Sequence, residues 1–244
     1  MIGRRCARLV AILSIVSLLN GCSAVDVLNA ITPSGSYALT SGIAYGSDPR
    51  QRLDVYRPKP SGSARPLVVF FYGGSWNRGD RRDYRFLGQA LAARGMVVVV
   101  PDYRVYPQVM YPKFLHDSAA AVAWAVREGA ALGADPERLY VMGHSAGAYN
   151  AAMLALDPRW LEQHGLSPQS LAGWIGLAGP YDFLPIINPE VRPVFNHPDY
   201  PSDSQPIAHV SPSAPPAFLA AAATDELVNP KRNTAQLAER LQQA

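Results

Sequence analysis

One short stretch constrains the fold of this chain more than any other. Residues 139–148 read Leu-Tyr-Val-Met-Gly-His-Ser-Ala-Gly-Ala, an apolar run followed by a serine between two glycines. The apolar part predicts a buried strand, and the alanine-rich residues 146–156 predict a helix. Glycines two residues before and after Ser145 let strand and helix pass closely, so that the turn presents the hydroxyl. The motif predicts a nucleophilic serine; its alternative is an ordinary turn between core elements.

The rest of the chain alternates between apolar runs and helical patterns. Runs such as 67–71 are apolar throughout, which is typical of strands that are covered on both faces. The predicted strands are 37–45, 52–56, 67–71, 96–100, 139–142, 172–178 and 217–223, and the predicted helices are 83–94, 113–128, 146–156 and 233–243. This alternation predicts an α/β fold, with a mostly parallel central sheet and helices on both faces. A turn is expected at residues 135–136.

Length and charge narrow the class of protein. The 244 residues suffice for one α/β domain with a sizeable core. The formal charge of +3 comes from 22 basic and 19 acidic residues. Three of the basic residues, Arg4, Arg5 and Arg8, lie among residues 1–21, which contain no acid. The remainder is therefore neutral, and no basic stripe indicates a nucleic-acid partner.

The first residues predict export from the cytoplasm. Residues 1–21 have a basic start, an apolar core from Leu9 to Leu19 and small residues after it, as in a signal peptide. The core is too short to span a bilayer comfortably. Its end, Leu-Asn-Gly-Cys22, resembles the lipobox of bacterial lipoproteins. The resemblance implies that Cys22 is lipidated and becomes the mature N-terminus.

The same resemblance implies a location in the cell envelope. Ser23 in place of aspartate implies passage to the outer membrane in a Gram-negative cell. The alternative is an ordinary cleaved signal and a secreted or periplasmic protein. Residues 22–36 are expected to form a tether between lipid and domain. Cys6 would leave with the signal peptide, so the mature domain has no internal disulfide, and its membrane contact is through the lipid alone.

A proline-rich segment interrupts the alternation. Residues 180–216 contain ten prolines and no helical period. An irregular stretch of this length is usually functional, for example a lid or a binding loop. A rigid surface connection is an equally open alternative.

A second motif follows the strand predicted at 67–71. Gly73-Gly74-Ser75-Trp76 places two glycines where backbone N–H groups can point at a developing oxyanion. In lipases and esterases such a loop supplies one donor, and the residue after the nucleophile supplies the second. The predicted donors are the backbones of Gly73 or Gly74 and of Ala146.

Taken together, these motifs resemble those of a known family. Six pieces match the α/β-hydrolase esterases that have an H-G-G-x-W oxyanion loop, a group with carboxylesterase, hormone-sensitive-lipase-like and kynurenine-formamidase-like members. The pieces are residues 52–56, 73–76, 101–104, 133–136, 143–147 and 223–228. The resemblance covers roughly residues 40 to 244 and implies an α/β-hydrolase domain over residues 37–244. It implies serine hydrolase chemistry without a metal or an organic cofactor.

The chain departs from the family at Tyr72, where a histidine is usual. Because the oxyanion donors are backbone groups, the chemistry is expected to survive this change. A phenol can also make a hydrogen bond that holds the loop.

The resemblance maps the acid of the catalytic triad onto Asp225, in Thr-Asp-Glu-Leu-Val at 224–228. Its role would be to orient a histidine and to stabilise the imidazolium. Glu226, its neighbour, and Asp182, after the preceding predicted strand, are the rival candidates; Asp182 can also be a loop-capping side chain.

The histidine of the triad has no obvious candidate. In this fold the order along the chain is serine, acid, histidine. None of the five histidines follows Asp225; they are His116, His144, His164, His197 and His209. The resemblance implies one more strand or loop with the base, so the sequence is expected to be truncated, with the last elements missing. The alternative is a substitute among the five, such as His197, if its segment folds over the site.

Three functions follow from these motifs. The first is hydrolysis of carboxylic esters through an acyl-enzyme at Ser145. The second is an arylformamidase-like amidase activity. The third is an inactive remnant that binds ligands without turnover, because a serine without a base is a poor nucleophile. The expected partner is a small-molecule ester, and no pattern indicates an oligomeric state.

Overall fold

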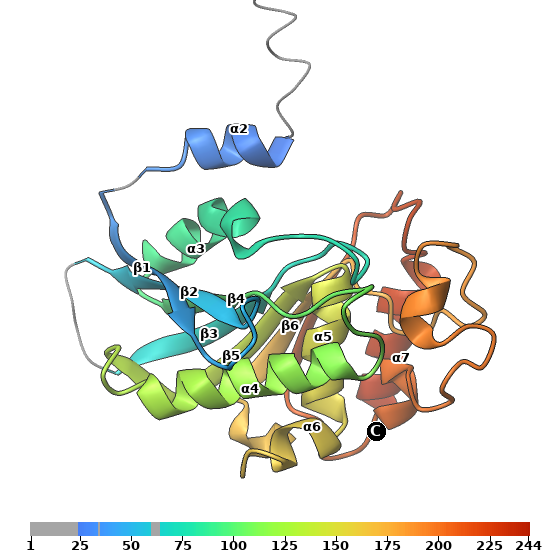
Figure 1. The fold of residues 1–244 in the computed structure, drawn as a ribbon. Coiled ribbons are helices and arrows are strands. Elements are labelled where there is room, and N and C mark those ends of the chain that lie inside the picture. The colour runs from blue at the N-terminus through green and yellow to red at the C-terminus, as the bar shows by residue number, and fades with distance from the viewer. Residues whose placement is uncertain (1–23, 34, 60–63) are drawn as a thin grey trace, which may run out of the picture.

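A seven-stranded sheet forms the centre of the molecule (Figure 1). The computed structural model describes residues 24–33, 35–59 and 64–244. The predicted signal peptide and Cys22 lie outside the described residues. The strand order is β1-β2-β4-β3-β5-β6-β7. The strands are β1 (Tyr37–Ala44), β2 (Arg52–Pro58), β3 (Arg65–Phe71), β4 (Val97–Pro101), β5 (Ala134–His144), β6 (Gly173–Leu177) and β7 (Ala217–Ala220).

The sheet is mostly parallel, as predicted. β1 pairs with β2 and β2 with β4 in antiparallel fashion, whereas β3 pairs in parallel with β4 and β5, and β5, β6 and β7 continue in parallel. All five residues of β4 are buried, and so are the last five of β3. These continuous apolar runs occupy the middle of the sheet, where both faces are covered.

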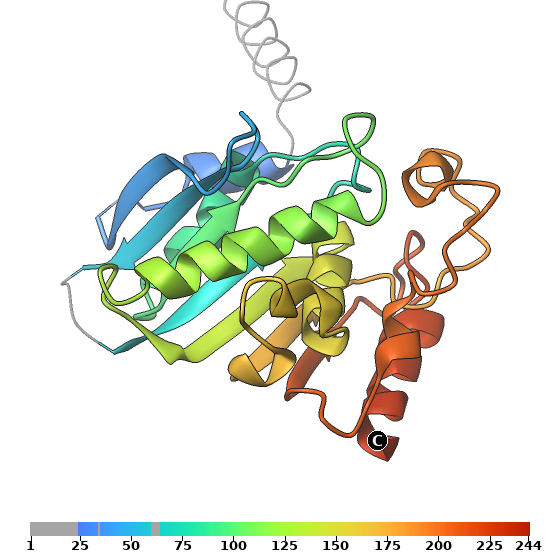
Figure 2. The same cartoon turned by 60° about the horizontal axis from the view of Figure 1, so that its bottom comes forward.

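Helices lie on both faces of the sheet. The α-helices are α2 (Ala24–Ala30), α3 (Arg85–Ala92), α4 (Lys113–Glu128), α5 (Ala146–Leu156), α6 (Arg159–Glu162) and α7 (Gln236–Gln243). α4 and α5 cover one face, and α3 lies on the other (Figures 1 and 2). Every residue of α5 is buried, because its small alanines let it pack closely between the sheet and its neighbours.

Several predicted bounds need correction. The predicted helix 83–94 begins as a 3-10 turn, η1 (Arg81–Tyr84), because the Asp80 carboxylate accepts from the Arg82 N–H and caps the chain there. The prediction of a turn at 135–136 was wrong, because these residues belong to β5. Asp135 pairs with Pro66 of β3, and the register shifts between Pro66 and Leu67. A π-helical turn, η5 (Lys231–Ala235), precedes α7.

Part of the segment predicted to be a tether is helical. α2 lies within residues 22–36 and is bound to the domain through Asn29. The Asn29 Nδ2 donates to the carbonyl oxygens of Arg82 and Asp83, at 3.1 and 3.0 Å. Asparagine has a low helix propensity, so the helix was not predicted. The bonds from Asn29 to the backbone of η1 leave no local sequence pattern, so the contact could not be predicted either.

The proline-rich segment 180–216 contains only short 3-10 turns, η3 (Arg192–Phe195) and η4 (Pro206–His209). It is nevertheless packed against the core. Phe195 is fully buried, and its ring lies edge-on to Trp76 with centroids 5.0 Å apart. The segment therefore has apolar anchors of its own, which hold an irregular backbone in place.

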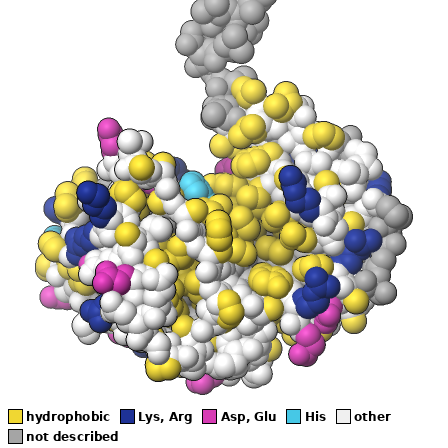
Figure 3. Space-filling model, turned by 180° about the vertical axis from the view of Figure 1, so that it is seen from behind, with side chains coloured by type: hydrophobic (Ala, Val, Ile, Leu, Met, Phe, Trp, Pro, Cys, Tyr) yellow, Lys and Arg dark blue, Asp and Glu magenta, His cyan; other side chains and the backbone are white. Residues whose placement is uncertain are grey.

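The sheet is less well covered beyond β6. Phe218 on β7 is 62 % exposed, and a groove of about 480 Å³ separates β7 from α7. Figure 3 shows hydrophobic side chains gathered over the middle of the rear face, opposite α4 and α6.

In the described part of the chain, no helix is long and apolar enough to cross a membrane.

Candidate active site

Ser145 lies at a sharp turn between β5 and α5, as its motif predicts. Its backbone has φ 53° and ψ −122°, in a region that side chains rarely adopt. The Ser145 N–H donates to the Leu177 carbonyl of β6 at 2.8 Å, and its carbonyl accepts from the Ala148 N–H at 2.9 Å. Bonds to the sheet and to the helix thus hold the serine in a strained conformation.

The two glycines of the motif are required by close contacts between backbones. A Cβ on Gly143 would lie 2.0 Å from the Gly147 carbonyl oxygen. A Cβ on Gly147 would lie 2.0 Å from the Phe71 carbonyl oxygen of β3. The helix therefore begins directly against two strands, which is the reason the sequence has glycine at both positions.

The Gly-Gly loop lies against the serine. A Cβ on Gly73 would be 3.0 Å from the Ser145 Cβ and 3.1 Å from the His144 Nδ1. Gly74 has a φ of 133°, which favours glycine, and its carbonyl accepts from the N–H groups of Asn77 and Arg78 at 3.1 Å. The structure therefore brings the predicted donor loop to the predicted nucleophile.

Trp76 anchors the other end of this loop. Its ring is buried, and its Nε1 donates to the Asn150 Oδ1 of α5 at 3.0 Å. Its ring stacks on Phe183 and meets Tyr149 edge-on. The loop is thus fixed to the same helix that begins at the nucleophile.

Tyr72, which stands where the family has histidine, holds the start of the loop. Its hydroxyl donates to the Asp102 Oδ1 at 2.9 Å and accepts from the Arg50 Nη2 at 3.0 Å. Its carbonyl accepts from the Tyr103 hydroxyl at 2.8 Å. Burial raises the pKa of Tyr72 well above its usual value, so the phenol stays protonated and donates. The expected loop-holding bond of the phenol is present.

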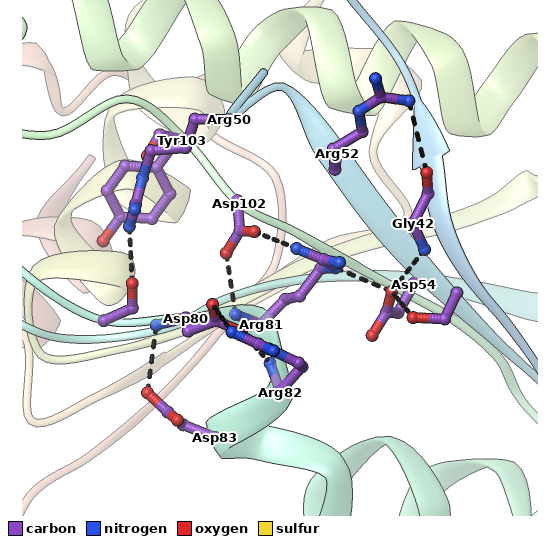
Figure 4. Close-up of polar contacts among 12 residues, drawn as sticks. Gly42, Arg50, Arg52, Asp54, Asp80, Arg81, Arg82, Asp83, Asp102 and Tyr103 are labelled. Atoms are coloured by element: carbon purple, nitrogen blue, oxygen red, sulfur yellow. Dashed lines mark hydrogen bonds and ion pairs between the residues drawn. The ribbon is translucent and has the colours of Figure 1, made fainter. Parts of the chain in front are cut away.

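Behind Tyr72, one arginine joins two buried carboxylates. Arg81 lies between Asp54 and Asp102 (Figure 4). Its Nε donates to the Asp54 Oδ1 at 2.8 Å, its Nη1 pairs with Asp102, and its N–H donates to the Asp102 Oδ1 at 2.8 Å. Burial raises the pKa of Asp102, and the bonds from Arg81 oppose this shift. Residues of the matched pieces 52–56 and 101–104 thus support the start of the predicted oxyanion loop.

The ring of His144 contacts Tyr84, and no hydrogen bond joins it to the Ser145 hydroxyl in the described residues. Its Nδ1 lies 2.8 Å from the hydroxyl of Tyr84, at the end of η1. Burial lowers the pKa of His144, and the negative charge of Asp225 opposes this shift. The ring is therefore neutral at pH 7, and Asp225 is near enough to the turn to act on it electrostatically.

Tyr84 was not predicted as a site residue. Burial raises its pKa, and a hydrogen bond from the Gly73 backbone opposes the shift. Tyr84 thus contacts both the donor loop and the residue before the nucleophile. Its position at the start of a predicted helix gave no signal of this contact.

The candidate acids are placed differently. Asp225 is half-buried in the loop after β7, and its Oδ1 accepts from the N–H groups of Leu227 and Val228 at 2.9 Å. Asp182 instead forms an ion pair with Arg232, with Nη2 and Oδ1 3.0 Å apart. Glu226 is exposed. Of the three, Asp225 is the carboxylate whose charge acts on the turn.

No histidine reaches the nucleophile in the part of the chain that the structure describes. The Ser145 hydroxyl has no hydrogen-bond partner among these residues. The four histidines outside the turn have contacts elsewhere: His116 with Gln163, His164 near His116, His197 with Tyr200 and His209 with the Asp203 carbonyl. His197, the substitute base suggested above, has an exposed ring that is bound to Tyr200 of its own loop and makes no hydrogen bond to Ser145 in the described residues.

Comparison with known proteins bears on this arrangement. The family model described as BD-FAE matches residues 53–241. The chain is 32 % identical to the probable isoprenylcysteine alpha-carbonyl methylesterase ICMEL1 of Arabidopsis thaliana, over 69 % of this chain and 37 % of that protein. It is 34 % identical to esterase LipC of Mycobacterium tuberculosis, over 82 % of this chain and 54 % of that protein. The chain thus spans between about a third and about half of the length of these relatives.

Among solved structures, the apo form of esterase 2 from Thermogutta terrifontis superposes with a TM-score of 0.71 at 24 % identity. The match covers 87 % of this chain and 81 % of that one. At this identity the likeness shows the fold, and the α/β-hydrolase fold expected from the sequence is confirmed.

Proposed function

The chain belongs to the BD-FAE family, and on that premise we propose that it is a serine hydrolase of carboxylic esters. The observation that carries this proposal is the contact between the nucleophile turn and the Gly-Gly loop. A Cβ on Gly73 would lie only 3.0 Å from the Ser145 Cβ, so the Gly-Gly loop lies directly against the serine. In our proposal the backbone donors of the loop and the serine hydroxyl border the same small volume. A carbonyl in that volume is within reach of both.

The proposed reaction proceeds through an acyl-enzyme. The Ser145 Oγ attacks the carbonyl carbon of the ester and loses its proton to a base, and the carbonyl electron pair moves to the oxygen. The N–H groups of Gly73 or Gly74 and of Ala146 donate to this oxyanion. Its collapse breaks the bond to the alcohol oxygen, which takes up a proton and leaves. Water then attacks the acyl group by the same route, releases the acid and restores the serine.

The base is the open part of this mechanism. The proposed role of Asp225 is to orient an imidazole and to stabilise its protonated form. His144 is the only histidine at the turn, and its Nδ1 is engaged by Tyr84. The resemblance assigns the base to a histidine after the acid, and no histidine follows Asp225 in the 244 residues. The reactivity of Ser145 in this chain is therefore the quantity to measure.

A fluorophosphonate probe measures the reactivity of Ser145 directly, because the probe reacts with activated serines. We expect labelling of the unaltered chain and none of Ser145→Ala, together with ester hydrolysis that the substitution abolishes. Unchanged turnover in Ser145→Ala would contradict the assignment of the nucleophile. A chain that stays unlabelled, although it is folded by circular dichroism, would favour the inactive remnant.

The amidase alternative is tested in the same assay. The ester activity is favoured because the relatives described above carry esterase names. Turnover of short p-nitrophenyl esters should exceed turnover of N-formylkynurenine. The reverse order would favour the arylformamidase-like activity.

We also propose that the protein is held in the cell envelope by a lipid on Cys22. The support is the sequence of residues 1–22, which combines a signal peptide with a lipobox-like end. Mass spectrometry of the N-terminal peptide should show an acylated Cys22, and Cys22→Ser should release the protein from the membrane fraction. A peptide that begins elsewhere and carries no acyl group would favour a secreted or periplasmic protein.

A further inference from the structure

Helix α2 presents its apolar side chains outward. Val27 and Leu28 lie in α2, and Ile31 follows its last residue; the Ile31 N–H donates to the Val27 carbonyl at 3.1 Å and continues the helical turn. The three side chains are 45 %, 42 % and 71 % exposed. Their spacing places them within about 100° of one another around the helix axis. A surface helix of a globular domain normally turns its apolar face to the core and its polar face to water. In α2 this arrangement is reversed.

The polar side of α2 faces the domain. Asn29 lies on the side away from Val27, and three hydrogen bonds attach it to η1 and α3. Its Nδ2 donates to the Arg82 and Asp83 carbonyls, and its Oδ1 accepts from the Phe86 N–H at 3.0 Å. These bonds fix which side of the helix points outward.

The position of α2 in the chain indicates what meets this outer side. Cys22 lies two residues before Ala24, where α2 begins. Two extended residues span about 7 Å at most. With Cys22 acylated and its chains in a bilayer, the start of α2 is held within about 7 Å of the lipidated residue, next to the headgroup region. Exposed apolar side chains gain free energy there by leaving water.

The same contacts connect α2 to the nucleophile. Asn29 binds the carbonyl groups of η1, and η1 ends at Tyr84, whose hydroxyl lies 2.8 Å from the His144 Nδ1. His144 immediately precedes Ser145. Figure 3 shows a hollow that opens toward the top of the molecule, the end at which Figure 1 places α2.

From this geometry we propose that Val27, Leu28 and Ile31 form a bilayer-contact surface that turns the Ser145 site toward the membrane. The substrate class that fits this orientation is an amphiphilic ester, whose apolar part stays in the lipid while its ester group reaches the site. The inference rests on the esterase function and the Cys22 anchor proposed above. It adds the orientation of the domain and the source of the substrate.

The depth of α2 in the membrane tests the surface without any need for activity. The full-length chain with Leu28→Cys, isolated as the lipoprotein, would carry a fluorescent label on its only free thiol. It would be reconstituted into vesicles of phosphatidylethanolamine and phosphatidylglycerol, with a spin-labelled lipid as quencher. The matched control is Glu162→Cys on α6, an exposed position at the opposite end of the molecule in Figure 1.

We expect quenching at position 28 to exceed quenching at position 162 at least threefold. Equal quenching at the two positions, in protein whose Cys22 is acylated, would overturn the proposal. Protein without an acyl group on Cys22 would overturn it as well, because the anchor would be absent.

The substrate class is tested with a pair of aspartate variants. Ile31→Asp introduces a charge into the proposed surface, and Phe218→Asp does so at a position of similar exposure, 62 % against 71 %, on the far edge of the sheet. Hydrolysis of p-nitrophenyl palmitate in vesicles is compared with hydrolysis of p-nitrophenyl acetate in solution. We expect Ile31→Asp to lower the first about tenfold and leave the second unchanged, and Phe218→Asp to affect neither.

Equal effects of Ile31→Asp on both esters would overturn the proposed substrate class. If the unaltered chain hydrolyses neither ester, the proposed esterase function fails, and the quenching measurement alone decides the membrane surface. The two failures are therefore distinguishable.

Discussion

The two loops beside Ser145 are held in different ways. The oxyanion loop begins at the buried Tyr72 and ends at the buried Trp76, and both side chains are bonded to other elements. The loop of Asp225 is held mainly by the two N–H groups that its own carboxylate accepts, and Leu227 beside it is 95 % exposed. Contacts with the core therefore hold the predicted nucleophile and the predicted donor loop, whereas local backbone bonds hold the predicted acid, Asp225. Substitutions on the two sides should differ accordingly in their cost.

Arg81→Met should have the largest effect. It removes the partner of two buried carboxylates, Asp54 and Asp102, and leaves their charge uncompensated. The free energy of unfolding should fall by about 4 kcal/mol, as measured by urea denaturation. The adjacent Arg82→Met is the control, because the Arg82 side chain is 74 % exposed, and its transition should stay near that of the unaltered chain. Equal losses in both variants would contradict a special role of the buried pair.

Gly147→Ala should come next. The added Cβ would lie 2.0 Å from the Phe71 carbonyl oxygen, so the helix must move away from the strand. We expect a loss of about 3 kcal/mol in unfolding free energy, with reduced probe labelling of Ser145. Gly35→Ala is the control, since nothing lies within 4 Å of its Cβ position. A stable Gly147→Ala variant with full labelling would show that the turn is more tolerant than its contacts indicate.

His144→Asn should have a smaller, pH-dependent effect. Burial lowers the pKa of His144 from 6.5, so the unfolded chain binds its proton at a pH where the folded chain does not. The His144 contribution to stability is therefore full above pH 6.5 and is lost as the pH falls below it. The asparagine variant should lose less stability than the unaltered chain between pH 7 and pH 5. If the stability of both proteins fell equally between pH 7 and pH 5, the proton taken up on unfolding would bind to a residue other than His144.

Phe218→Ser on β7 should have the smallest effect. The ring is already 62 % exposed, so truncation removes little buried surface. The unfolding free energy should change by less than about 0.5 kcal/mol in thermal or urea denaturation. A loss above about 1.5 kcal/mol would show that this face of the sheet is covered in solution.

The sequence predicted the elements whose cause is local. The run 67–71 and the helices 113–128 and 146–156 follow from apolar pattern and helix propensity, and the structure confirms them. The glycine motif located Ser145, because a close backbone approach forces glycine. The resemblance predicted the fold, which is confirmed. It also predicted the donor loop, which lies against Ser145 and whose role stays a prediction.

What the sequence did not predict depends on contacts between distant residues. Tyr84 reaches His144 across 60 positions, and Arg81 reaches Asp54 across 27. Asn29 attaches α2 to residues more than 50 positions away, in a segment that composition alone marks as a tether. No periodicity or spacing rule encodes such pairs, since each is created by the fold itself.

The two borders of the sheet differ in a way that matters for handling the protein. β1 has an irregular register between Thr40 and Ile43, which interrupts its outer row of backbone groups. β7 pairs regularly with β6, and in the described chain it has no neighbour on its other side. Its free N–H and C=O groups, next to an exposed aromatic ring, are a template for a strand from another molecule. Concentrated samples should self-associate along this border, and a lysine at position 218 should keep them dispersed.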